Sequence, residues 1–172
     1  MINYDLKKIR LVAMDVDGVL SRQTVQMSAE GVPTRTADIK DGYVMQLALR
    51  LGLRLAIITG GGDDAVRRRY EALGVKDIYM NAGKKITVYE KLIERMGLRD
   101  EEVIYVGDDI PDYEVMKRCG LPCCPSDAAT EIKEIARYVS PVRGGEGCVR
   151  DIIEQVLRGQ GKWVLDDTAF GW

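Results

Sequence analysis

Short apolar runs alternate along the chain with longer stretches of helical period, and this alternation limits the possible fold most. The runs are almost continuously apolar and lie at Ile9–Met14, Leu53–Ile58, Ile78–Met80, Val103–Val106, Leu121–Cys124 and Tyr138–Val139. Between most of them, apolar residues recur three or four apart, at Asp41–Leu51, Asp63–Leu73, Lys85–Met96, Tyr113–Cys119, Ala128–Ala136 and Glu146–Leu157. Apolar strands without polar alternation are typical of parallel sheets that are covered by helices. The sequence therefore predicts one α/β domain over residues 1–172, a Rossmann-like parallel sheet with helices on both faces.

One segment departs from this alternation. Residues 22–39 show partial two-residue alternation on either side of a turn signal at Glu30–Gly31, which predicts a β-hairpin after the first strand. The segment could be a plain surface loop. Because it directly follows an acidic pair, we expect instead a lid or a contact with another subunit.

The totals exclude several classes of protein. Among 172 residues, 25 basic and 27 acidic residues give a net charge of −2, which does not favour nucleic acid or a membrane surface. No apolar run approaches the length needed to span a bilayer, and no signal-peptide core is visible, so we expect a cytoplasmic protein. The four cysteines fit no common zinc pattern, and free buried thiols are expected. Histidine is absent, so a divalent metal would be held by oxygen ligands.

Reactive side chains follow the predicted strands where each strand ends. Asp15 and Asp17 follow the first predicted strand, and Thr59 and Gly60 follow the second. Lys85 begins the helix after the third strand, and Asp108 and Asp109 follow the fourth. Ligands of open α/β sheets bind beyond the carboxyl ends of the strands, so these groups should meet at one edge. Each signal alone is weak, since a lone acidic pair is a common turn. Several carboxylates at one edge require a cation, and together the signals predict a Mg²⁺ and phosphate site.

These residues resemble the four motifs of the haloacid dehalogenase superfamily of phosphohydrolases, in the same order. Asp15-x-Asp17 resembles the first, Thr59 the second, Lys85 the third, and Gly107-Asp108-Asp109-x-x-Asp112 the fourth. The resemblance implies a haloacid dehalogenase-like fold and a covalent mechanism. Asp15 would attack phosphorus, and Asp17 would act as acid and then as base.

The resemblance also implies how the cofactor and the phosphate are held. Mg²⁺ would be bound by the Asp15 carboxylate, the Asp17 backbone carbonyl and Asp108, while Asp109 or Asp112 would hold metal-bound waters. Thr59 and Gly60 would bind the phosphoryl group, and Lys85 would neutralise the phosphate and the nucleophile.

The gaps between the motifs leave no room for a cap domain. Only 41 residues separate Asp17 from Thr59, and 25 separate Thr59 from Lys85. Within the capless branch, Lys40-Asp41-Gly42-Tyr43 and Gly144-Gly145-Glu146-Gly147 resemble the 3-deoxy-D-manno-octulosonate 8-phosphate (KDO 8-phosphate) phosphatase family. That resemblance implies a homotetramer, with central hairpins and a neighbour's C-terminal tail (about residues 162–172) helping to close each site, and a role in lipopolysaccharide biosynthesis.

Substrate identity is left open by two glycines. Gly61 and Gly62 stand where related phosphatases carry a charged residue, arginine in enzymes of KDO 8-phosphate and glutamate in those of sialic-type 9-phosphates. The preferred hypothesis is a phosphatase of KDO 8-phosphate, and the alternative is a phosphatase of a nonulosonic acid 9-phosphate. Arg67, Arg68 or Arg69 could compensate, or could form a solvated helix face.

Two remoter readings belong to other classes of protein. A receiver domain, which accepts a phosphoryl group without turnover, also gathers carboxylates, a threonine and a lysine around Mg²⁺. Its phosphoacceptor lies on the third strand, whereas the third strand here ends in Met80-Asn81. A catalytically dead binding module is the other reading, and the intact Asp15 and Asp17 argue against it.

Overall fold

The computed structural model describes residues 1–164 and 167–171, and its centre is a six-stranded parallel sheet. The strand order is β5-β4-β1-β6-β7-β8, and every neighbouring pair is parallel. The strands are β1 (Leu11–Met14), β4 (Arg54–Ile58), β5 (Asp77–Tyr79), β6 (Val103–Val106), β7 (Leu121–Cys124) and β8 (Tyr138–Val139). The predicted parallel α/β sheet is therefore confirmed.

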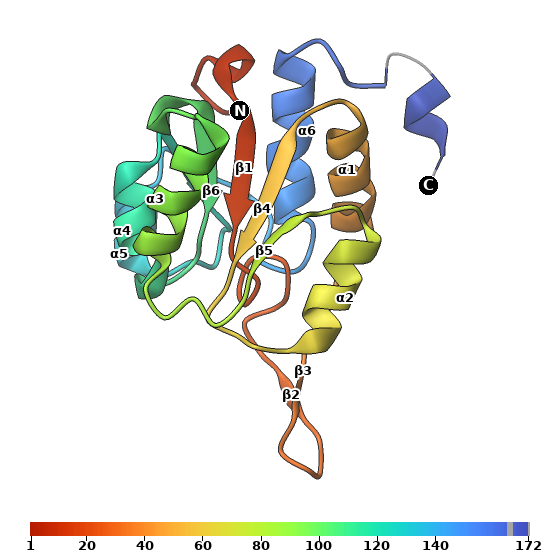
Figure 1. Ribbon diagram of the computed structural model, residues 1–172, viewed down its shortest axis with the longest axis vertical. Helices are drawn as coiled ribbons and strands as arrows, with labels where there is room; N and C mark the ends of the chain where they lie inside the picture. Colours follow the sequence, from red (N-terminus) through yellow and green to blue (C-terminus); the bar gives the residue numbers. More distant parts are fainter. Residues whose placement is uncertain (165–166, 172) are drawn as a thin grey trace.

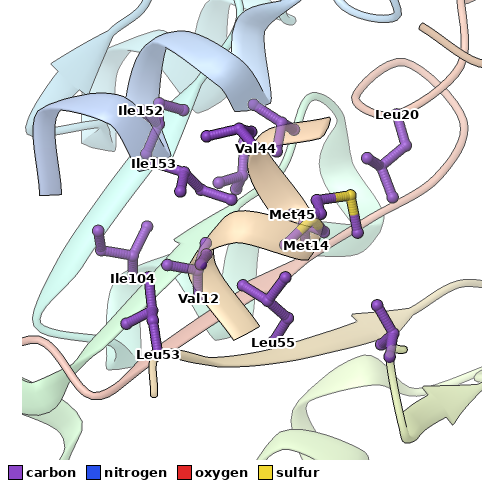
Figure 2. Close-up of a cluster of buried hydrophobic side chains, with 14 of the residues drawn as sticks. Val12, Met14, Leu20, Val44, Met45, Leu53, Leu55, Ile104, Ile152 and Ile153 are labelled. Carbon is purple, nitrogen blue, oxygen red and sulfur yellow. The ribbon is translucent and has the colours of Figure 1, made fainter. Parts of the chain in front are cut away.

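Helices cover both faces of this sheet, as Figure 1 shows. The first group is α1 (Ile39–Arg50), α2 (Asp64–Ala72) and α6 (Cys148–Gly159), and the second is α3 (Lys85–Met96), α4 (Tyr113–Arg118) and α5 (Thr130–Ile135). Each group packs on one of two buried apolar clusters. Successive strand residues point to opposite faces, so Val12 and Met14 join the first cluster while Leu11 and Ala13 join the second. Figure 2 shows Val12 and Met14 beneath side chains of α1 and α6.

The helix boundaries differ slightly from the predicted ones, and at α1 a capping residue sets the difference. Helix α1 was predicted from Asp41 but begins at Ile39, since the Asp38 carboxylate accepts the N–H groups of Lys40 (2.7 Å) and Asp41 (3.0 Å). The helices predicted at Ala128–Ala136 and Glu146–Leu157 are α5 and α6, and each begins two residues later.

Asp41 links α1 to α6 through the core. The side chain is buried, and its Oδ1 accepts the N–H of Arg150 in the first turn of α6 at 2.6 Å. The other oxygen, Oδ2, has no hydrogen-bond partner among the described residues. Burial raises the pKa of Asp41 to about 7. Asp41 thus caps a helix whose own N-cap residue, Gly147, has no side chain.

The predicted hairpin is present and projects from the carboxyl ends of the strands (Figure 1). It consists of β2 (Gln26–Met27) and β3 (Pro33–Thr34), which pair antiparallel and form a separate two-stranded sheet. Large apolar side chains of the hairpin are exposed, namely Val25, Met27 and Val32. The hairpin therefore has no apolar core of its own.

The C-terminal tail packs on its own chain, away from the hairpin (Figure 1). The Tyr43 hydroxyl donates to the carbonyl of Ala169, and Arg50 donates to the carbonyl of Gly171 at 2.8 Å. The Trp163 ring lies against the guanidinium groups of Arg150 and Arg158. Residues 165, 166 and 172 of the predicted tail lie outside the described residues.

The described residues also bear on the predictions about the cysteines and about a membrane span. The four cysteines are free and buried, as expected. Within residues 1–164 and 167–171, no helix combines the length and the apolar character that crossing a membrane requires.

Candidate active site

A cavity of about 710 Å³ lies at the carboxyl ends of the central strands. It brings together residues that four separate segments supply, as the positions of the motifs predict. Those predicted residues in its lining are Asp15, Asp17, Thr59, Gly60, Gly61, Lys85, Asp108 and Asp109. Asp112 lies behind the lining and is completely buried, and Gly62 is not part of the lining.

The turn after β1 positions the acidic pair. Strand β1 ends at Met14, and the Asp15 N–H still donates to the carbonyl of Val106 on β6 at 3.0 Å. Gly18 closes the turn with a φ of 80°, in the left-handed region that favours glycine. A Cβ atom on Gly18 would lie 1.8 Å from Oδ2 of Asp108. The glycine therefore allows the carboxylate after β6 to approach the turn after β1.

Lys85 forms a buried ion-pair network at the first position of α3. Its Nζ lies 2.5 Å from Oδ2 of Asp15 and 2.7 Å from Oδ1 of Asp112. The Tyr105 hydroxyl donates to the same Asp112 oxygen at 2.7 Å, and the Asp108 N–H donates to Oδ2 of Asp112 at 3.1 Å. Burial alone would lower the pKa of Lys85, but the carboxylates of Asp112 and Asp15 raise it above its ordinary value. Lys85 is therefore a fixed ammonium group beside Asp15.

Three carboxylates form a cluster that suits a divalent cation. Oxygen atoms of Asp15, Asp108 and Asp112 all lie within 4.8 Å of one another. Burial and the charge of Asp112 raise the pKa of Asp15 to about 6, and burial with the charges of Asp112 and Asp15 raises that of Asp108 to about 7. A single lysine does not neutralise three carboxylates, and hard oxygen ligands are those that Mg²⁺ prefers. The donor set present thus fits Mg²⁺.

The two acidic residues expected beside the metal ligands occupy different places. Asp112 lies in the carboxylate cluster itself, where its oxygen atoms are within reach of a bound cation or of a water molecule on that cation. Asp109 is exposed, and its carboxylate accepts the N–H of Ile110 at 2.8 Å. Asp112 lies six residues after the end of β6, at a buried position where Tyr105 and Lys85 donate to its carboxylate.

Thr59, Gly60 and Gly61 line the cavity after β4, on the other side of β1 from the end of β6. Thr59 is buried, and its hydroxyl accepts the N–H of Gly61 at 3.2 Å. A Cβ atom on Gly62 would lie 2.4 Å from the amide oxygen of Asn81, and one on Gly61 would lie 3.2 Å from Nη2 of Arg35. The two glycines therefore make room for side chains from other segments. Of the three arginines on α2, Arg67 pairs with Glu71 at 3.5 Å.

Three residues at the site carry no motif and were missed in the sequence. Arg35 binds the Asp17 carboxylate, with its Nε 2.6 Å from Oδ1. Gln23 donates to Oδ2 of Asp108 at 3.4 Å and to the carbonyl of Asp127 at 2.8 Å, and both Gln23 and Asp127 line the cavity. Gln23 and Arg35 flank the hairpin, and only their nearness to the acidic pair in sequence could have indicated them.

Comparisons with known proteins agree with this geometry. Residues 69–150 match the haloacid dehalogenase-like hydrolase family. The 3-deoxy-D-manno-octulosonate 8-phosphate phosphatase KdsC of Escherichia coli K12 is 36% identical over 162 residues, which cover 94% of this chain and 85% of that protein.

Solved structures give the same result. The phosphatase of that name from Yersinia pestis superposes with a TM-score of 0.89 at 32% identity, covering 92% of this chain and 85% of that one. The phosphatase from Moraxella catarrhalis, solved in complex with a magnesium ion, a phosphate ion and KDO, has a TM-score of 0.89 at 31% identity and covers 92% of this chain and 91% of that one. The chain therefore belongs to the haloacid dehalogenase-like hydrolases, in the family of the 3-deoxy-D-manno-octulosonate 8-phosphate phosphatases.

Proposed function

We propose that this protein is a Mg²⁺-dependent phosphomonoesterase that hydrolyses KDO 8-phosphate to KDO and phosphate. The observation that carries the proposal is the buried cluster in which Lys85 holds Asp15 beside Asp108 and Asp112. The similar phosphatase solved with magnesium, phosphate and KDO supports both the cofactor and the substrate.

The carboxylate cluster and one backbone group would hold the cation. Asp15, Asp108 and the backbone carbonyl of Asp17 are its proposed ligands, and Asp109 and Asp112 would orient metal-bound waters. Mg²⁺ bound there supplies positive charge against the phosphoryl oxygens. Because Asp112 also accepts from Lys85 and Tyr105, it fixes the lysine as well.

Asp15 is the proposed nucleophile. Its carboxylate oxygen bonds to phosphorus, the bond from phosphorus to the sugar oxygen breaks, and the departing alkoxide takes a proton from Asp17. In the second half, a water molecule gives its proton to Asp17 and attacks phosphorus. The bond to Asp15 then breaks, which releases phosphate and restores both carboxyl groups.

The remaining groups of the site stabilise charge. The Lys85 ammonium, 2.5 Å from Asp15, would offset the negative charge that gathers on the nucleophile and the phosphoryl group. The Thr59 hydroxyl and the Gly60 N–H would donate to phosphoryl oxygens. Both residues line the cavity directly after the end of β4.

A second subunit is the proposed cover of the open site. The exposed apolar side chains of the hairpin, Val25, Met27 and Val32, suit burial against other hairpins in a homotetramer. The tail packs on its own chain, away from the hairpin (Figure 1), and we propose that in the assembly it helps to close a neighbour's site. With this assembly we propose a cytoplasmic enzyme that serves lipopolysaccharide synthesis.

A phosphate-release screen tests the function. The unmodified chain is assayed with KDO 8-phosphate, nonulosonic acid 9-phosphates and neutral sugar phosphates, with Mg²⁺ and with a chelator. We expect the highest kcat/KM for KDO 8-phosphate, loss of turnover in the chelator, and no turnover by Asp15→Asn. A higher kcat/KM for a 9-phosphate would overturn the substrate assignment, and multiple turnovers by Asp15→Asn would overturn the mechanism.

A further inference from the structure

Arg35 lies just after β3, at the base of the hairpin, and its side chain points back toward the active site. The side chain is 13% exposed although the neighbouring hairpin residues are largely exposed. We propose that Arg35 is a positioning residue, which holds the Asp17 carboxylate in the orientation needed for proton transfer. This role rests on the proposed phosphatase chemistry, but not on KDO as the substrate.

Two parallel hydrogen bonds join the arginine to the carboxylate. Nε of Arg35 donates to Oδ1 of Asp17 at 2.6 Å, and Nη2 donates to Oδ2 at 2.9 Å. Such a fork fixes the plane of the carboxylate as well as its position, which a single contact does not. A carboxylate offers about four acceptor sites, so each oxygen keeps one for exchanging a proton.

The guanidinium is itself fixed from a third direction. Nη1 of Arg35 lies 3.5 Å from Oδ2 of Asp63, whose other oxygen caps α2 by accepting the N–H of Ala65 at 2.8 Å. Nη2 also lies where a Cβ atom on Gly61 would come within 3.2 Å. The missing side chain at Gly61 thus leaves space for the arginine. Asp63 at the start of α2 and the base of the hairpin therefore both fix the position of Arg35.

Asp17 needs such a support because its surroundings are open. Its side chain is 42% exposed, and it follows β1 in a turn rather than in a strand. Across the described part of the chain, Arg35 supplies its side-chain hydrogen bonds. A free carboxylate would sample several rotamers, and a small misplacement of an acid–base group lowers the rate strongly. Arg35 therefore confines Asp17 to one orientation.

Substrates differ in how much their leaving groups need a proton from Asp17. A sugar alkoxide needs a proton as it departs, whereas 4-nitrophenolate is stable without one. The value of kcat/KM reports the steps up to the first irreversible one, which is loss of the leaving group. Misplacing Asp17 should therefore lower kcat/KM for alkyl phosphates and spare that for the aryl phosphate.

The experiment compares Arg35→Ala with the unmodified chain on KDO 8-phosphate, ribose 5-phosphate and 4-nitrophenyl phosphate. We expect kcat/KM to fall at least about tenfold for both sugar phosphates and less than about threefold for the aryl phosphate. Arg35→Lys keeps the charge but loses the fork, and should recover only part of the loss. Arg22→Ala is the matched control, because it removes the same charge at the other end of the hairpin. Among the described residues, the ion pair of Arg22 is with exposed Glu146 at 3.4 Å.

Each other pattern overturns the positioning role. Equal losses on all three substrates mean a structural role, and thermal melting of each variant reports that directly. A loss on KDO 8-phosphate alone means that Arg35 binds the substrate's carboxylate. If the unmodified chain hydrolyses ribose 5-phosphate but not KDO 8-phosphate, the substrate assignment fails while Arg35 is still tested. If it hydrolyses none of the three, the proposed function itself fails.

Discussion

Replacing Lys85 with methionine tests the buried charge network, because it removes one cation and leaves an unbranched side chain that is only one atom shorter. The Lys85 side chain is 4% exposed, and its partners Asp15 and Asp112 are 11% and 1% exposed. Removing one member of a buried ion pair costs about 3–5 kcal/mol, since the partners are left buried and charged. We therefore expect Lys85→Met to lose about 3–5 kcal/mol of unfolding free energy in a chelator. At roughly 2–4 °C per kcal/mol, Tm should fall by about 6–20 °C.

Denaturant unfolding with EDTA and with Mg²⁺ measures this effect. Mg²⁺ should stabilise Lys85→Met more than the unmodified chain, because the cation would replace the lost positive charge beside Asp15 and Asp108. Adding Asp112→Asn to Lys85→Met should cost less than the sum of the single changes, by about 0.5–3 kcal/mol. A loss below about 1 kcal/mol in EDTA, or strict additivity of the two changes, would refute the reasoning.

Three further predictions concern other parts of the molecule. Gly18→Ala should weaken Mg²⁺ binding, measured by calorimetry, at least about tenfold, because the added Cβ clashes with Asp108. Gly52 is the control, since it has a similar φ but open space around it, and Gly52→Ala should only cost about 1–2 kcal/mol of stability. The pKa of Asp41 is about 7 in the folded protein, so the folded state binds this proton more tightly than the unfolded state does. The ionised carboxylate therefore lowers the unfolding free energy by an amount that grows from about pH 4 to pH 7. Asp41→Asn should therefore be more stable than the unmodified chain at pH 8, by roughly 1–3 kcal/mol in urea unfolding. Its unfolding free energy should also depend less on pH between pH 5 and 8, and an unchanged slope would contradict this. Met27→Ser should shift light-scattering mass from tetramer toward monomer, and an unchanged mass would oppose hairpin assembly.

The sequence predicted the sheet and the motif residues because both depend on local patterns. Continuous apolar runs identify buried strands, and the carboxyl ends of parallel strands must meet at one edge. The residues that local patterns did not reveal come from irregular segments, whose path depends on tertiary contacts. Arg35 and Gln23 reach the site only because the hairpin folds back, and Asp127 lies in the loop after β7.

The two glycines after Thr59 show the same limit. The sequence shows no charged residue directly after Thr59 and Gly60, and it offers Arg67, Arg68 and Arg69 as possible replacements. In the structure Arg35 occupies the space beside Gly61 instead. Arg35 lies 26 positions before Gly61 in the sequence, and no pattern within a single helix or strand could indicate that the two residues meet.

Trapping the covalent intermediate tests whether Asp15 is the nucleophile, because it identifies the residue that bonds to phosphorus. The unmodified chain is mixed with KDO 8-phosphate and Mg²⁺, quenched during turnover, and reduced with borohydride, which converts an aspartyl-phosphate to homoserine. Peptide mass spectrometry then locates the converted residue. We expect homoserine at position 15, and we expect its formation to require both substrate and Mg²⁺. Homoserine at another aspartate, or none while phosphate is released, would contradict it.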